Sequence, residues 1–155
     1  IGFLPGTEQE KIFPLMRPIL DNLEILVDSN EKERYNNEKE LEDKVRELFD
    51  RRIITTEAVG YLRGRSITKN WLVVDEAQNL TPKQVKAIVT RVGVGTKLLL
   101  IGDPEQIDQA FLDSRSNGLS YASEKMKGSP LCYQVTLKHD ECERSPLAYE
   151  ASKRL

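Results

Sequence analysis

Apolar residues recur along the chain at two different spacings, which together predict a mixture of helices and strands. Helical spacing predicts helices over residues 7–23, 38–50, 82–92 and 119–126, and another after Ser145-Pro146. Short apolar runs predict strands at Ile53–Thr56, Trp71–Asp75, Lys97–Gly102 and Tyr133–Leu137. The strand–helix–strand order in the middle of the chain has the length of a parallel crossover, so we expect an α/β fold.

The signals for helix ends differ in strength. Thr81-Pro82 followed by Gln84 forms a capping box with proline at the first helical position, which predicts a sharp helix start. Thr7 and Glu10 form a similar box, but proline residues inside the 7–23 pattern argue for a break or kink. We expect residues 28–37 to be a polar connector.

Composition limits the possible functions. The 155 residues are enough for one domain, and 23 Lys and Arg against 25 Asp and Glu give a net charge of −2. A uniformly basic polyanion binder is therefore excluded, and any contact with nucleic acid must use a local patch. No apolar run approaches the roughly 20 residues of a membrane span. Cys132, Cys142 and the single His139 lack zinc-site spacing, and a reducing cytosol is the expected compartment.

Residues 28–52 are dense in charges of both signs. Leu41, Val45, Leu48 and Phe49 give the segment a thin apolar stripe, which predicts an amphipathic helix on the surface. A partner-docking segment and a solvated insertion both fit this pattern. The solvated insertion is favoured, because runs of charge usually face water.

Two carboxylates follow the apolar run Trp71–Val74 at once. Ligands of open α/β sheets bind at the carboxyl ends of strands, where Asp75 and Glu76 are expected to lie. Neighbouring residues on a strand point in opposite directions, so one acid would hold Mg²⁺ and the other would orient an attacking water. The alternative is that both acids simply end a strand in solvent.

A second apolar run, Leu98–Ile101, is followed by Gly102-Asp103-Pro104-Glu105-Gln106. Gly102 permits a close backbone approach, and the Gln106 amide is able to sense a phosphate or a water. A turn without function is the alternative. Two neighbouring strands that both end in carboxylates favour one shared site.

These motifs in this order resemble the PhoH family of phosphate-starvation-associated ATPases. Asp75-Glu76-Ala77-Gln78 resembles a Walker B box, and Gly102–Gln106 resembles the G-D-x-x-Q motif of superfamily 1 helicases. Weaker matches are Gly2–Gly6, Tyr61–Ser66, Thr90-Arg91 and Asn117–Leu119, while Glu143–Ala148 resembles the branch fused to a PIN nuclease domain. The resemblance implies a RecA-like P-loop NTPase core, with a parallel sheet flanked by helices.

The resemblance also implies roles for individual residues, with ATP and Mg²⁺ as cofactors. Asp75 would hold Mg²⁺, Glu76 would position the hydrolytic water and Gln106 would report the γ-phosphate. Arg144 would meet the γ-phosphate in the transition state, its alternative being a plain surface residue. The set expected around the nucleotide is Asp75, Gln78, Gly102 and Asp103, and Gln78 would also connect it to the nucleic-acid side.

No G-x-x-x-x-G-K-[ST] phosphate loop occurs in the sequence. In the family this loop lies upstream of a segment like Ile1–Gly6. We therefore expect residues 1–155 to be the C-terminal portion of a PhoH-like ATPase domain, with 28–52 as a charged helical insertion. The Walker A strand and helix, and a PIN domain, would precede it. This piece alone is expected to bind ATP weakly and to be inactive.

The basic segment Arg63-Gly64-Arg65, with Tyr61 and Lys69, is the best candidate contact for single-stranded RNA. Arginine neutralises phosphates and tyrosine stacks on bases. A basic surface loop is the alternative.

Three functions are weighed. The first is cytoplasmic ATP hydrolysis coupled to RNA binding or unwinding, in the hexameric rings that the resemblance suggests. The second is a catalytically silent RNA-binding or assembly module. The third, a metal-dependent nuclease using Asp75 and Glu76 directly, is disfavoured because the two side chains diverge and no third acid is placed with them.

Overall fold

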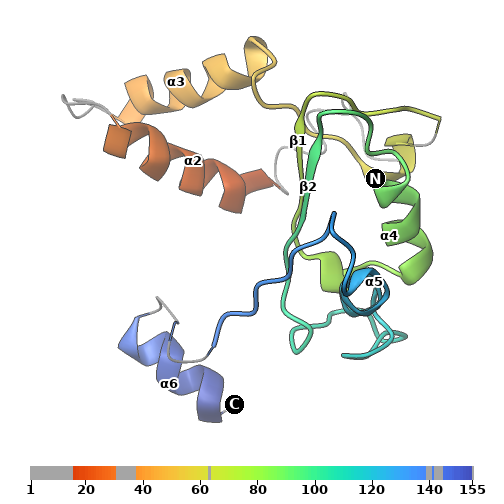
Figure 1. Cartoon of the computed structure of the whole chain (residues 1–155). Coiled ribbons are helices and arrows are strands. Elements are labelled where there is room, and N and C mark those ends of the chain that lie inside the picture. The colour runs from red at the N-terminus through yellow and green to blue at the C-terminus, as the bar shows by residue number, and fades with distance from the viewer. Residues whose placement is uncertain (1–15, 31–37, 63, 139–140, 142–144, 155) are drawn as a thin grey trace. The chain divides into compact units, whose positions relative to one another are not determined.

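The computed structural model describes residues 16–30, 38–62, 64–138, 141 and 145–154 (Figure 1). Contacts divide the chain into two compact units, Ile1–Ala58 and Val59–Leu155. The elements are α2 (Arg17–Asn30), α3 (Glu38–Asp50), η2 (Val59–Leu62), β1 (Trp71–Val74), η3 (Ala77–Asn79), α4 (Pro82–Val89), β2 (Lys97–Leu100), α5 (Gly118–Met126) and α6 (Pro146–Arg154). Within the described residues, every helix is too short or too polar to cross a membrane.

The first unit contains the helices α2 and α3, which pack on each other (Figure 1). Leu20 of α2 and Val45 of α3 are buried, and Leu41 and Leu48 are half-buried on the same side of α3. These α3 residues recur at helical spacing, so one face is apolar and the rest faces water. The predicted amphipathic helix over 38–50 is confirmed.

The helix predicted over residues 7–23 continues beyond its predicted end. Helix α2 begins at Arg17, with Pro18 in its first turn, where the backbone amides have no partner within the helix and proline is tolerated. The helix continues to Asn30, so residues 28–30 are helical and not part of a connector. The predicted start at Thr7 lies outside the described residues.

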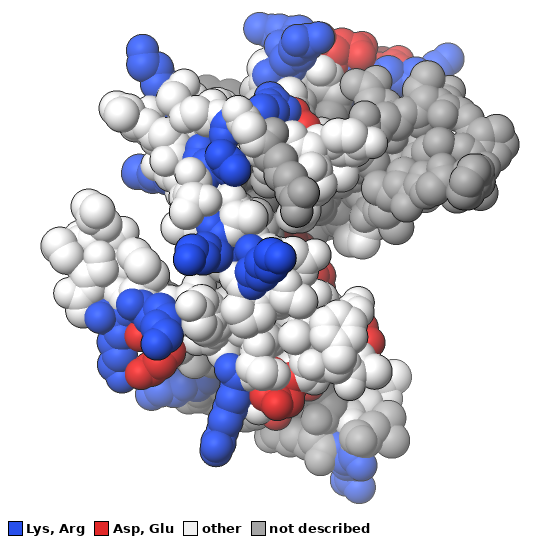
Figure 2. Space-filling view, turned by 90° about the vertical axis from the view of Figure 1, so that its right-hand side faces the viewer, with Lys and Arg blue, Asp and Glu red and all other residues white. Residues whose placement is uncertain are grey.

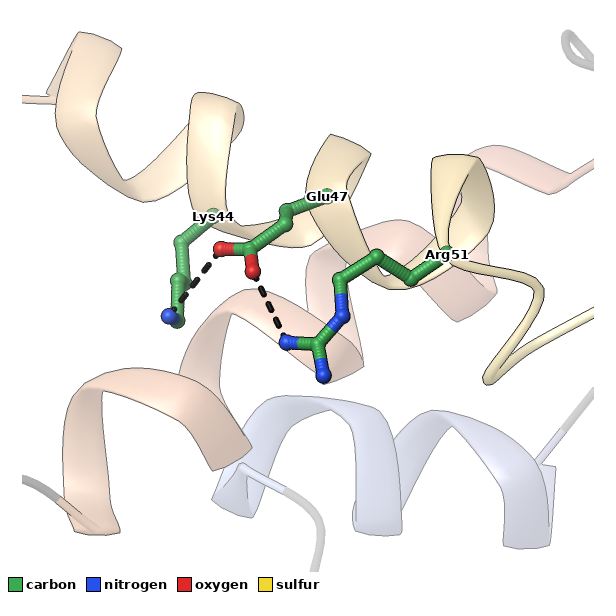
Figure 3. Close-up of polar contacts among 3 residues, drawn as sticks. All are labelled: Lys44, Glu47 and Arg51. Carbon is green, nitrogen blue, oxygen red and sulfur yellow. Dashed lines mark hydrogen bonds and ion pairs between the residues drawn. The ribbon is translucent and has the colours of Figure 1, made fainter.

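Charged side chains link successive turns of α3 (Figure 3). Glu47 accepts hydrogen bonds from Arg51 Nη1 at 2.9 Å and from Lys44 Nζ at 3.1 Å. The bond from Arg51, and then that from Lys44, holds the pKa of the Glu47 carboxyl below its ordinary value. Such exposed pairs at spacings of three and four residues support a helix only weakly, as expected of a solvated face.

The strand predicted at Ile53–Thr56 is wrong, because this segment forms a turn and a loop. The amides of Ile53 and Ile54 both donate to the carbonyl oxygen of Leu48, at 2.9 and 3.2 Å. The last carbonyls of a helix need such donors. The backbone of this segment therefore closes the end of α3, and those amides are not available for a sheet.

In the second unit, β1 and β2 form a parallel pair in which Trp71 lies opposite Lys97 and Val74 opposite Leu100. Helix α4 connects the two strands and lies beside them (Figure 1). An isolated parallel bridge between Ile67 and Val92 precedes the pair. The predicted α/β crossover is confirmed.

The capping residues that the sequence indicates at the start of α4 form the expected hydrogen bonds. Thr81 and Gln84 form both halves of the predicted capping box at the start of α4, with Pro82 in its first turn. Val85 and Ile88 are the buried residues of α4, and α5 packs against this helix and against η3. The predicted helices after Asn117 and Ser145 are confirmed as α5 and α6.

The unbroken apolar run of β1 is typical of a parallel strand covered on both faces, and this expectation is wrong for the described residues. Trp71 is 68% exposed and Val73 is 55% exposed, while the alternate residues Leu72 and Val74 are half-buried. One face of the pair is therefore open. The Lys97 ammonium lies 4.6 Å from the centre of the Trp71 ring on this open face, a cation–π contact.

The strand predicted at Tyr133–Leu137 is also wrong. The described part of this region has no regular structure, and Tyr133, Val135 and Leu137 are all exposed. A strand needs a neighbour for its main-chain groups, and β1 and β2 pair only with each other among the described residues. The alternating pattern alone does not provide that neighbour.

Candidate functional site

The loops that follow β1 and β2 begin side by side at the carboxyl end of the pair. The Ile101 amide donates to the Val74 carbonyl, and the Ala77 amide donates to the Ile101 carbonyl, both at 2.9 Å. These bonds extend the ladder one step beyond the strands. They bring the segment Asp75–Asn79 against the segment Gly102–Gln106, as the sequence predicts.

Glu76 has a left-handed backbone conformation, with φ 53° and ψ 36°. A residue with a β-carbon adopts this region rarely and at some energetic cost. The Glu76 amide donates to Asp75 Oδ1 at 3.0 Å, which orients the neighbouring carboxylate. Both acids are exposed, and strain of this kind gathers at functional sites.

Gln78 joins the two loops from a buried position, with only 1% of its surface exposed. Its Nε2 donates to Glu76 Oε2 at 2.6 Å and to the main-chain oxygen of Gln106 at 2.9 Å. Its Oε1 accepts from the Asp103 amide at 3.3 Å. The predicted site residues Glu76, Gln78, Asp103 and Gln106 are therefore brought together in one hydrogen-bonded cluster.

Asp103 organises the second loop. Its Oδ1 accepts from the Glu105 amide at 3.0 Å, and its Oδ2 accepts from Gln106 Nε2 at 2.6 Å. The Gln106 side chain is thus turned toward Asp103. Its main-chain oxygen, and not its side chain, makes the contact with Gln78.

Each acid of the first loop keeps one oxygen without a hydrogen bond among the described residues. Asp75 Oδ1 accepts the Glu76 amide, which leaves Oδ2 open. Glu76 Oε2 accepts from Gln78 and, at 3.4 Å, from Asn79 Nδ2, which leaves Oε1 open. One carboxylate is available to a cation and the other to a water. Across the described residues there is no cluster of three or more potential metal-ligating side chains.

Asn79 is a site residue that our reading of the sequence missed. Its side chain contacts Glu76 and also accepts the Asp108 amide at 2.8 Å, which ties a third stretch of chain to the cluster. Its place directly after Asp75–Gln78 was the available signal. Asn117, which the sequence indicates only as part of a weaker family match, is fully buried and caps α5 by accepting the Ser120 amide.

The predicted nucleic-acid contacts lie elsewhere in the second unit. Tyr61, in η2, is 60% exposed, and Arg65 is exposed just before the bridge at Ile67. This segment leads to the amino end of β1, whereas Asp75 and Glu76 follow its carboxyl end. Arg63 and Arg144 lie outside the described residues. Figure 2 shows the described Lys and Arg side chains in several small groups on the face in view, some of them beside Asp and Glu.

A parallel strand–helix–strand unit with an Asp-Glu pair after one strand and a polar loop after the next has the α/β architecture of P-loop NTPases. A family model described as PhoH-like protein matches residues 1–154, and the chain belongs to the PhoH family.

Three relatives illustrate this membership. Protein PhoH2 of Bacillus subtilis (strain 168) is 47% identical over 156 residues, covering 100% of this chain and 33% of the relative. A PhoH-like protein of the same organism is 35% identical, covering 95% and 41%. Protein PhoH2 of Mycolicibacterium smegmatis is 32% identical, covering 96% and 30%. The chain thus spans less than half the length of these relatives.

Proposed function

We propose that the chain provides the magnesium-binding and water-positioning part of an ATP hydrolysis site, coupled to the binding or unwinding of RNA. The observation that supports this most directly is the state of Glu76. One of its carboxylate oxygens is held by two side-chain amides, and the other makes no hydrogen bond among the described residues. A carboxylate fixed in this way is suited to orienting a water for attack.

Asp75 suits a magnesium ion. Its Oδ2 is open and the residue is exposed at the strand end, and Mg²⁺ in nucleotide sites is held by one or two carboxylates together with phosphate oxygens. When bound, Mg²⁺ neutralises charge that develops on the transferring phosphoryl group. Asp75 would hold the ion, through water, and Glu76 would hold the nucleophile.

The remaining parts of the active site are assigned by family resemblance. The sequence contains no G-x-x-x-x-G-K-[ST] motif, so in this proposal the phosphate-binding loop comes from outside residues 1–155 of the full-length gene product. Arg144 would stabilise charge on the γ-phosphate. The exposed Tyr61 and Arg65, with Arg63, would contact single-stranded RNA.

The test is Glu76→Gln in the full-length gene product. This substitution keeps the shape of the side chain and removes its negative charge, so kcat for ATP hydrolysis should fall by roughly 100-fold or more while ATP still binds. The matched control is Glu124→Gln, at an exposed carboxylate on α5. Unchanged turnover in Glu76→Gln would remove Glu76 from the mechanism. RNA binding without any hydrolysis by the unsubstituted protein would favour the silent RNA-binding module.

A further inference from the structure

Every hydrogen-bonding group of the Gln78 carboxamide is engaged inside the protein. A glutamine amide has two N–H donors, and Gln78 uses them on Glu76 Oε2 and on the Gln106 main-chain oxygen. Its oxygen accepts the Asp103 amide. With 1% of its surface exposed, the side chain has neither a free donor nor an open path to a nucleotide.

We propose that Gln78 is a positioning residue that sets the orientation of Glu76, and that Gly102 is glycine in order to admit the Gln78 side chain. The proposal rests on the hydrolytic role of Glu76 given above. It replaces the expectation that Gln78 and Gly102 contact the nucleotide. The buried amide of Gln78 then joins the Asp75–Gln78 motif to the Gly102–Gln106 motif, and we call this arrangement the interlock.

The geometry at Gly102 supports the second half of this proposal. A β-carbon built on Gly102 would overlap Gln78 Oε1, and it would also lie 3.1 Å from Leu119 Cδ2 and 3.2 Å from the Ala77 nitrogen. The backbone of Gly102 is not in the left-handed region, so conformational freedom is not what this position requires. What it requires is space, and the nearest atom in that space belongs to Gln78.

The interlock has a mechanical consequence. The same Gln78 nitrogen holds the Glu76 carboxylate and the backbone of the loop that carries Gln106. A displacement of the second loop would therefore withdraw the support of Gln78 and change the direction in which Glu76 Oε1 points. Coupling of this kind needs a contiguous set of contacts, and here it consists of a single side chain.

The first experiment separates positioning from nucleotide binding. In the full-length gene product, Gln78→Met keeps roughly the size of the side chain but removes both donors, so kcat should fall by roughly 10- to 100-fold while KM for ATP changes less than threefold. Gln109→Ala, at an exposed glutamine of the second unit, is the control. A rise in KM at constant kcat would overturn the proposal, because it would identify Gln78 as a nucleotide ligand.

The second experiment is a double-mutant cycle between Gly102→Ala and Gln78→Ala. Gly102→Ala alone should lower the unfolding midpoint, whereas Gly60→Ala should not, because a β-carbon on Gly60 meets nothing within 4 Å. The midpoint loss of the double variant should be smaller than the sum of the two single losses, since the overlapping oxygen is gone. The double variant should remain as slow in hydrolysis as Gln78→Ala, because Glu76 is still unsupported.

The two experiments fail in distinguishable ways. If the unsubstituted protein hydrolyses no ATP, the proposed function is wrong, and the interlock is then judged by the unfolding midpoints alone. If the protein hydrolyses ATP but the midpoint losses of Gly102→Ala and Gln78→Ala simply add, the interlock is wrong and the proposed function stands. A combined midpoint loss smaller than the sum of the single losses, without rescue of kcat, supports both.

Discussion

The amide of Gly118 donates a hydrogen bond of 2.7 Å to the carbonyl oxygen of Leu80, which joins the start of α5 to the residue that follows η3. A β-carbon on Gly118 would overlap Val85 Cγ2 of α4 and would lie 2.7 Å from the same Leu80 oxygen. The next residue, Leu119, lies against Gly102. Helix α5 therefore supports both loops of the candidate site from behind.

Gly118→Ala should destabilise the protein by overpacking. The added methyl group has no space between α4 and the Leu80 carbonyl, so we expect the free energy of unfolding to fall by about 1–3 kcal/mol. Urea unfolding measures this as a lower midpoint at constant m-value. Gly60→Ala, which has open space around the added carbon, is the control. An equal effect in both variants would show that packing at Gly118 is not the cause.

Local signals explain what the sequence predicts correctly. Thr81 and Gln84 of the capping box are three residues apart, so the local sequence includes both partners of that interaction. The apolar residues of β1 are likewise consecutive in the sequence. The acids after β1 and the polar loop after β2 were predicted to meet because parallel strands carry their carboxyl ends to one edge. The hydrogen bonds of Gln78 confirm that meeting.

Interactions between distant segments explain what the sequence did not predict. The Tyr133–Leu137 pattern fits a strand, but strand formation depends on a neighbour that no local pattern reveals. The exposure of Trp71 and Val73 has the same origin, because coverage of a sheet face comes from other parts of a fold. Gln78 packs against Gly102 because the loops after β1 and β2 lie close together, and only the three-dimensional structure shows how close they are.

Asp75→Asn should weaken the binding of the Mg²⁺ that hydrolysis requires, without disturbing the loop. The asparagine keeps an oxygen for the Glu76 amide but loses the charge that attracts the cation. We expect the Mg²⁺ concentration that gives half-maximal ATPase activity to rise about 10- to 100-fold, as for groups that hold a metal through water. Asp50→Asn, at the exposed end of α3, is the control. An unchanged Mg²⁺ titration would exclude Asp75 as the metal-holding residue.

Arg65→Ala should weaken RNA binding in a manner that depends on salt. Loss of one phosphate contact should reduce the slope of log K against log salt concentration by about 1. The variant Lys83→Ala, at an exposed lysine of α4, should keep both affinity and slope. If Arg65→Ala keeps the slope as well, Arg65 makes no phosphate contact.

Tyr61→Ala should weaken RNA binding by a different mechanism. Tyr61 is largely exposed, and loss of base stacking should cost about 1–3 kcal/mol of binding free energy. Because the ring carries no charge, the salt slope should stay unchanged. Tyr61→Phe keeps the stacking surface and should bind nearly as well as the unsubstituted protein. Equal losses in Tyr61→Ala and Tyr61→Phe would contradict stacking.

Asp113 should make the stability of the second unit depend on acidic pH. Its Oδ1 accepts the Ser116 amide at 2.7 Å and the Arg115 amide at 2.8 Å, in the turn before α5. These two bonds, that of Ser116 first, hold the pKa of the Asp113 carboxyl below its ordinary value. A carboxyl whose pKa is lower in the folded state stabilises that state above its unfolded pKa of about 3.9. This contribution is lost as the pH falls through the folded pKa.

The variant Asp113→Asn tests this dependence. It should unfold at a lower urea concentration than the unsubstituted protein at pH 7, because a neutral oxygen accepts the two amides less strongly. The difference should shrink as the pH falls below about 4 and the aspartate becomes protonated. Asp43→Asn, at an exposed aspartate on α3, is the control for a general effect of charge. A difference between Asp113→Asn and the unsubstituted protein that is the same at pH 7 and pH 3 would mean that the charge of Asp113 contributes nothing to the turn.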